Sequence, residues 1–239
     1  MKDWIDDRPV IIAEGRDCFL KDIYGNWYLD GVSSIWVNIH GHRKKEIDEA
    51  VREQLGRIAH STMLGLSNVP AIRLAKRIID LVAHSLGESG LSRVFYSDNG
   101  STAVEVALKM AFQYWVHKGV RGRNSFLSLN HAYHGDTLGA VSVGGIDLFH
   151  GIFRPLLFTT FKAPSPYCYR CELGLSCTDC GFGCLDGMEE ILKADHGKIA
   201  AVILEPLVQA AGGMIVAPPG YLGGVRRLCF PCSTQEGWN

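Results

Sequence analysis

Beyond residue 93 the chain alternates short apolar segments with a long amphipathic helix, and this alternation constrains the fold most strongly. Residues 94–96 and 126–129 are apolar enough for strands, and residues 199–204 are almost wholly apolar. Between the first two, residues 102–118 predict a helix that ends at Gly119. Apolar strands that alternate with helices are typical of a mostly parallel sheet buried between helical layers. The sequence therefore predicts an α/β fold.

The first part of the chain has a different pattern. Apolar residues 18–20 and 27–29 flank the turn-rich residues 22–26, which predicts a hairpin. Residues 44–58 carry apolar side chains at spacings of four, four and three, as one helix face does, and a second helix is predicted after Asn68.

These patterns predict three consecutive parts. We expect an N-terminal small-domain segment over residues 1–60 and the front of a larger α/β domain over residues 61–229, with a cysteine-rich loop at 164–184. Residues 230–239 follow neither a helical nor a strand period and interrupt an amphipathic pattern that begins at Tyr221. We therefore expect an aberrant tail and a domain that is cut short.

Composition excludes several classes of partner. The net charge is -1 over 239 residues, so we expect no nucleic-acid partner. No apolar run approaches the roughly 20 residues that span a bilayer, so we expect no membrane association. Residues 1–8 are charged where a signal peptide is apolar, which predicts a cytoplasmic protein.

The turn at residues 97–102 is the first candidate for chemistry. A predicted strand runs into Gly100 and then into a helix that starts with Ser101 and Thr102. Backbone N–H groups and the positive end of the helix dipole suit a phosphate group at such a turn. The alternative is a plain helix cap, because Asn and Ser are also good capping residues.

Two common nucleotide-binding motifs are absent. The chain contains neither Gly-x-Gly-x-x-Gly after a strand nor Gly-x-x-x-x-Gly-Lys-Ser/Thr. A smaller phosphorylated cofactor is the remaining possibility for the turn.

Two further segments follow predicted strands. Tyr133 and His134 precede a glycine, and an aromatic ring there could cover a flat ligand. Glu205 follows the strand at 199–204, where α/β sheets bind ligands. For each segment the alternative is a surface loop without a ligand.

These motifs occur together in an order that resembles the class-III aminotransferases, which depend on pyridoxal 5'-phosphate. Two other segments resemble the subfamily that makes diaminopelargonate in biotin synthesis, and the resemblance covers roughly residues 5 to 229. The family motifs are residues 97–105 (SDNGSTAVE), 133–137 (YHGDT), 202–206 (VILEP) and 209–214 (QAAGGM), and the subfamily motifs are residues 29–41 (LDGVSSIWVNIHG) and 107–115 (ALKMAFQYW).

The resemblance implies a fold type I transferase and assigns cofactor-binding roles. Gly100 and Ser101 would hold the cofactor phosphate. Tyr133 would stack near the pyridine ring, His134 would line the same pocket, and Glu205 would order the surroundings of the ring.

The resemblance also implies the substrates and the assembly. Trp36 would form part of the substrate wall, together with Tyr133. The reaction would transfer an amino group to 8-amino-7-oxononanoate and give 7,8-diaminononanoate, with S-adenosylmethionine or lysine as the donor. Ile35 stands where some members carry a second Trp, which leaves the donor open. Members of the family form homodimers.

Two family residues have no counterpart in these 239 residues. Family members use a lysine that attaches the cofactor and moves protons, and an Asp that keeps the pyridine nitrogen protonated. The Asp-Glu-Val/Ile stretch does not occur, and the lysines present, such as Lys162, Lys193 and Lys198, lack the context of the later Gly-Lys stretch. We therefore expect no catalytic residue in this chain and no activity from it as given. The alternatives are a noncatalytic fragment or pseudoenzyme, or a metal-binding interaction module.

That last alternative rests on the cysteine-rich loop. Five of the eight cysteines lie between Cys168 and Cys184, and two Cys-x-x-Cys pairs are a common sign of zinc. Only five residues separate Cys171 from Cys177, fewer than in common zinc ribbons. We expect reduced cysteines rather than a closed metal site at Cys168, Cys171, Cys177 and Cys180. The alternative is zinc or an iron–sulfur cluster.

Overall fold

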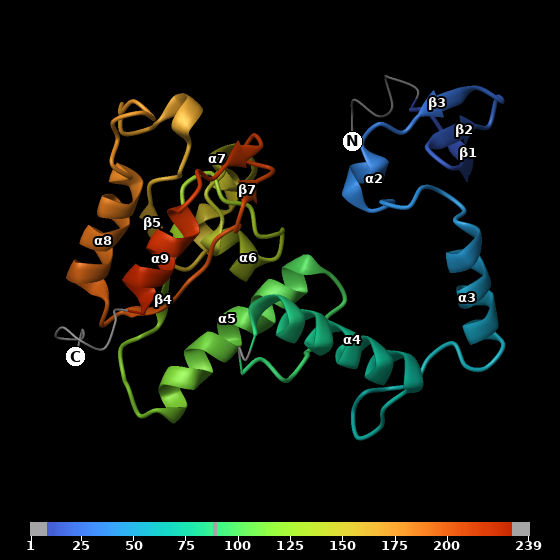
Figure 1. Cartoon of the computed structure of the whole chain (residues 1–239), viewed down its shortest axis with the longest axis horizontal. Coiled ribbons are helices and arrows are strands. Elements are labelled where there is room, and N and C mark those ends of the chain that lie inside the picture. The colour runs from blue at the N-terminus through green and yellow to red at the C-terminus, as the bar shows by residue number, and fades with distance from the viewer. Residues whose placement is uncertain (1–8, 88–89, 231–239) are drawn as a thin grey trace. The chain divides into compact units, whose positions relative to one another are not determined.

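The computed structural model describes residues 9–87 and 90–230, which fall into two compact units, Met1–Val94 and Phe95–Asn239 (Figure 1). The predicted division near residue 60 stays a prediction. The predicted aberrant tail lies outside the described residues except for Phe230, which follows the last helix.

The first unit contains a three-stranded antiparallel sheet in the order β1-β2-β3. Its strands are β1 (Ile12–Arg16), β2 (Phe19–Asp22) and β3 (Trp27–Leu29). The β2–β3 pairing confirms the predicted hairpin. Asp22 holds its turn, because its carboxylate accepts hydrogen bonds from the backbone N–H groups of Tyr24 and Asn26, each 2.9 Å long.

Three helices follow in this unit, α2 (Ser33–Trp36), α3 (Lys45–Leu55) and α4 (Val69–Leu86). The last two confirm the helices predicted from apolar spacing, and Asn68 caps α4 by accepting from the N–H of Ala71 at 3.0 Å. None of the hydrophobic side chains described in this unit is buried. Local hydrogen bonds rather than a packed core therefore define these elements.

The second unit is built on a parallel sheet in the order β5-β4-β6. Its strands are β4 (Ser125–Leu129), β5 (Phe161–Ala163) and β6 (Ile199–Val202), so the predicted α/β fold with a parallel sheet is confirmed. The strand predicted at residues 94–96 is wrong, because these residues form no strand.

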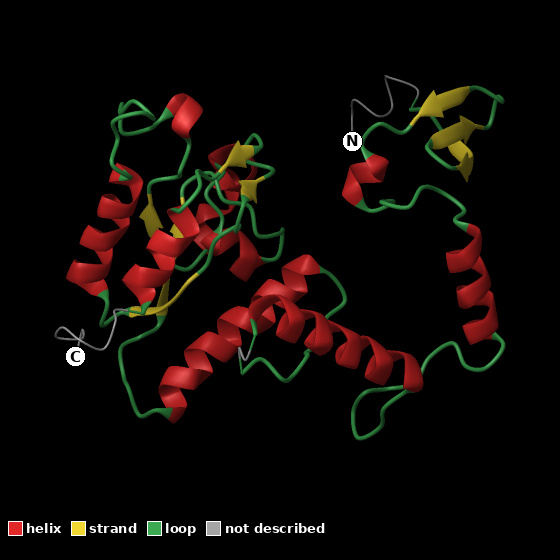
Figure 2. Ribbon diagram, viewed as in Figure 1, coloured by secondary structure: helices red, strands yellow, loops and turns green. Residues whose placement is uncertain are grey.

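Helices cover both faces of this sheet (Figures 1 and 2). On one face, α5 (Gly100–His117) and α6 (Leu138–Val143) contribute Leu108 and Val143 to a cluster with Phe126 of β4. On the other face, α8 (Gly183–Asp195) and α9 (Tyr221–Cys229) pack side by side and cover Leu127 and Leu129 of β4. Phe126 and Leu127, which are adjacent in β4, therefore belong to opposite clusters, as strand geometry requires.

Short elements connect the layers. They are α7 (Asp147–His150), the 3-10 helices η1 (Gly151–Leu156) and η2 (Cys168–Arg170), and an antiparallel pair of β7 (Val208–Gln209) with β8 (Ile215–Val216). Within the described ranges, no helix has both the length and the apolar character that crossing a membrane requires.

Candidate functional site

The candidate site lies where the strands of the parallel sheet end. Asn130 follows β4, Pro164 follows β5, and Glu205 lies three residues beyond β6. Because the three strands are parallel, their carboxyl ends share one edge, which is where ligands of α/β sheets bind.

The first turn of α5 is fixed by a reciprocal cap. The Asn99 side chain accepts from the N–H of Thr102 at 3.0 Å, and the Thr102 hydroxyl accepts from the N–H of Asn99 at 3.1 Å. A Cβ atom added at Gly100 would have no atom within 4 Å, so the helix start is open on that side. The N–H groups of Gly100 and Ser101 lie in the first turn, which has no acceptors within the helix, so they fit a phosphate group.

Ser101 joins this helix start to the segment between β4 and α6, residues 130–137, which we call the Tyr133 loop. Its hydroxyl accepts a hydrogen bond from the backbone N–H of Asp136 at 3.1 Å. Gly135 has a φ of 123°, and a Cβ atom at that position would overlap the Ser101 side chain. The structure thus brings the predicted phosphate turn and the predicted ring-binding loop into direct contact.

Tyr133 is held from three sides. Its backbone N–H donates to Glu205 Oε1 at 3.0 Å, and its hydroxyl donates to Asp136 Oδ2 at 2.9 Å. The ring of His150 stacks on the Tyr133 ring, with 6.2 Å between centroids and 15° between planes. Burial, followed by the hydrogen bond to Asp136, raises the pKa of Tyr133, so its hydroxyl stays protonated. The other oxygen of Glu205 accepts from the N–H of Ala210 at 2.9 Å.

His134 follows in the same loop, with its Nε2 atom buried and without a partner among the described residues. Burial lowers the pKa of His134 to about 4, and the positive charge of Lys162 adds to the effect. Lys162 donates to Ser128 Oγ at 2.7 Å and to the carbonyl of Gly144 at 2.5 Å, and burial lowers its pKa to about 8. The site therefore contains a neutral imidazole, that of His134, and a partly buried amine, that of Lys162.

A second network ties the strand ends together. Gln209 begins one of the predicted family motifs, but sequence reasoning missed its hydrogen-bond partners. Gln209 is buried, and its side chain donates to the carbonyl of Asn130 at 2.8 Å and accepts from Ser165 Oγ at 2.5 Å. The Glu172 carboxylate accepts from the side chain of Asn130 at 2.7 Å and from the N–H of Ser165. No local pattern predicts Glu172 here, because it acts on residues distant in the sequence.

Two other predicted sites involve other segments of the chain. Trp36 lies in the first unit, in a turn where residues 33 to 36 all have positive φ, and its contribution to a substrate wall stays a prediction. The cysteines at 168, 171, 177 and 180 have free thiols. In the two described stretches, no group of three or more His, Cys, Asp or Glu residues could hold a metal ion. Whether the loop binds metal stays a prediction.

Proteins of one family resemble this chain in sequence and in fold. The family model described as Aminotransferase class-III matches residues 1–231. An adenosylmethionine-8-amino-7-oxononanoate aminotransferase of Geobacter sulfurreducens is 55% identical over 230 residues, which cover 96% of this chain and 50% of that protein. The crystal structure of such an enzyme from Methanocaldococcus jannaschii matches with a TM-score of 0.85 at 44% identity, over 95% of this chain and 48% of that one.

A PLP-bound amine transaminase from an uncultivated Pseudomonas species has the same fold. It matches with a TM-score of 0.86 at 36% identity, over 94% of this chain and 50% of that chain. The chain therefore spans about half the length of the relatives that it matches.

Proposed function

This chain belongs to the class-III aminotransferase family, and from that premise we propose that it forms the front part of an aminotransferase of biotin synthesis. The amino group would pass to 8-amino-7-oxononanoate and give 7,8-diaminononanoate. The names of the relatives support S-adenosylmethionine as the donor. Lysine is the alternative donor, because Ile35 stands where some members carry Trp.

The observation that carries the cofactor part of this proposal is the hydrogen bond between Ser101 and Asp136, which joins the helix start to the Tyr133 loop. Pyridoxal 5'-phosphate is the cofactor of the family, and when bound it supplies an electron sink for amino transfer. The N–H groups of Gly100 and Ser101 would hold its phosphate, and the Tyr133 ring would cover its pyridine ring.

Residues of other segments position Tyr133. Glu205 fixes the backbone of Tyr133, and His150 fixes the plane of its ring. Because His134 is neutral at pH 7, it can line the pocket without adding a charge beside the ring. Trp36 would contribute to the substrate wall.

We propose that the 239 residues alone do not catalyse amino transfer. Lys198 follows Gly197, but no Asp-Glu-Val/Ile stretch precedes this pair as it does in the family, so no positioned amine moves the proton. Positioned acid–base catalysis typically contributes about 10² to 10⁴-fold. We further propose that the active form is a cytoplasmic homodimer, as the family resemblance implies.

A chimera tests the proposed function. Residues 1–229 would continue into the second half of the Geobacter sulfurreducens relative, and the chimera would be expressed in a bacterial strain that lacks its own enzyme for this step. We expect growth without biotin. A folded chimera that binds cofactor but fails to support growth would contradict the assigned substrate.

The phosphate assignment has its own test in the same chimera. Ser101→Asp places a negative charge at the helix start, so cofactor affinity should fall by about tenfold or more. Ser176→Asp, at an exposed position of the cysteine-rich loop, is the matched control. Equal affinities of the two variants, measured by titration of cofactor absorbance, would contradict the assignment.

A further inference from the structure

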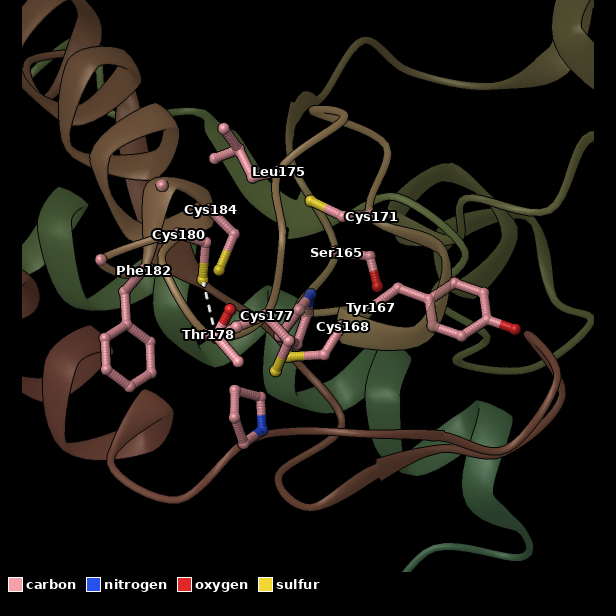
Figure 3. Close-up of a pocket in the computed structure, with 14 residues that line it drawn as sticks. Ser165, Tyr167, Cys168, Cys171, Leu175, Cys177, Thr178, Cys180, Phe182 and Cys184 are labelled. Carbon is pink, nitrogen blue, oxygen red and sulfur yellow. Dashed lines mark hydrogen bonds between the residues drawn. The ribbon is translucent and has the colours of Figure 1, made fainter.

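The cysteine-rich loop encloses a pocket of about 230 Å³ (Figure 3). Five thiols line it, together with apolar side chains such as Leu175 and Phe182. The lining cysteines are Cys168, Cys171, Cys177, Cys180 and Cys184, all with free thiols. Neither the proposed reaction nor the candidate site uses this cluster.

Two of these thiols lie next to each other. Figure 3 shows the sulfur atoms of Cys168 and Cys177 side by side in the pocket, and the two thiols interact electrostatically. Cys177 is exposed, whereas Cys168 is half-buried. The thiol of Cys180 instead points toward the backbone carbonyl of Cys177, at 3.8 Å. Cys168 and Cys177 are therefore the best-placed pair for a sulfur–sulfur bond.

The loop between these two cysteines is tethered at its middle. Glu172 lies there, and its carboxylate accepts hydrogen bonds from Asn130 and Ser165 at the ends of β4 and β5. The tether restricts the loop before any bond forms, which lowers the entropy cost of bringing the two sulfurs together. The hydrogen bonds of Glu172, which lie outside the pocket, thus help to keep Cys168 and Cys177 close together.

We propose that Cys168 and Cys177 form a modification site, a dithiol that a hydroperoxide oxidises to a disulfide. The exposed Cys177 attacks a peroxide oxygen as its thiolate, the O–O bond breaks, and hydroxide leaves. Cys168 then attacks the sulfur of the resulting sulfenic acid, and a second hydroxide leaves. Each hydroxide takes up one thiol proton, so hydrogen peroxide gives two molecules of water.

The order of attack follows from the surroundings of the two thiols. Burial, followed by the neighbouring thiol of Cys177, raises the pKa of Cys168 to about 11. Cys168 therefore stays protonated at neutral pH and is slow to react with peroxide by itself. It reacts once Cys177 presents an electrophilic sulfur next to it.

Peptide mapping of the full chain can locate the bond. The chain would be washed with a chelator, treated with hydrogen peroxide, alkylated, and digested without reductant. Cleavage after Lys162, Arg170 and Glu172, and before Asp179 and Asp186, places Cys168 in peptide 163–170 and Cys177 in peptide 173–178. We expect these two peptides to be linked, with the loss of two hydrogen atoms, and to separate on reduction.

Variants make the test specific. Cys168→Ser and Cys177→Ser should both lose the linked species, whereas Cys18→Ser, at an exposed thiol of the first unit, should keep it. The proposal is overturned if Cys177 links mainly to the peptide with Cys180 and Cys184, or if it is oxidised to sulfinic acid while Cys168 stays a thiol. Because the unsubstituted chain gives the main result, a variant that fails to fold does not weaken the test.

Discussion

Gly135 lies where the Tyr133 loop meets the first turn of α5, and any side chain at this position would displace neighbouring atoms. Its φ is 123°, and a Cβ atom would overlap the side chain of Ser101. We expect Gly135→Ala to lower the free energy of unfolding by about 2–5 kcal/mol, from backbone strain together with overpacking. Chemical denaturation measures the change.

A second glycine separates these two causes. Gly174 also has a positive φ, of 69°, but a Cβ atom there would have no neighbour within 4 Å. Gly174→Ala should therefore lower the free energy of unfolding only through backbone strain, by about 1 kcal/mol. Equal losses in the two variants would show that the contact with Ser101 contributes nothing.

His134 makes stability depend on pH. Burial lowers its pKa from 6.5 to about 4 in the folded chain, so the unfolded chain binds the proton first as the pH falls. The stability that His134 contributes is complete above pH 6.5 and is lost toward pH 4. We expect a loss of about 1–3 kcal/mol over that window.

Unfolding measured from pH 7 to pH 4, in the parent chain and in His134→Gln, checks this. The variant should lose less stability on acidification, because its side chain does not titrate. His84→Gln, at an exposed position near the end of α4, is the control for loss of a histidine as such. Parallel profiles for the parent chain and His134→Gln would contradict the prediction.

At the scale of elements, the start of α5 depends on its cap. Asn99 and Thr102 satisfy each other's backbone N–H groups. Asn99→Ala removes the side-chain acceptor and should cost about 0.5–2 kcal/mol of unfolding free energy. Asn99→Asp keeps an oxygen acceptor and should restore most of the loss. If Asp destabilises as much as Ala, the hydrogen bond is not the reason for the cap.

At the scale of the whole molecule, the two units differ in how they are stabilised. Leu127 and Leu129 of β4 are fully buried, whereas α3 and α4 have no buried residue. Hydrogen exchange followed by mass spectrometry should therefore find β4 and β6 the slowest to exchange and α3 and α4 much faster, because exchange follows local stability. Equal protection of α4 and β4 would contradict this expectation.

The sequence by itself determined the elements that depend on local periodicity. Helices α3, α4 and α5, the β2–β3 hairpin and strand β4 follow from apolar spacing and turn residues within a few positions. It also determined the family, because ordered motifs such as 97–105 and 133–137 occur in one chain. Both kinds of information lie in short segments, which is why sequence reasoning reaches them.

Only the tertiary structure decided which residues meet. Strand β5 has three residues, one of them Lys162, and pairs with β4 along its whole length, whereas the more apolar residues 94–96 form no strand. The left-handed turn of α2 depends on Asp30, which binds the N–H and the hydroxyl of Ser34.

The candidate site depends on tertiary contacts in the same way. Glu205 binds the N–H of Tyr133 across 72 positions, and Glu172 binds Asn130 across 42. Local sequence patterns do not predict such pairs. The hydrogen bonds form only after the parallel strands have brought their carboxyl ends to one edge of the sheet.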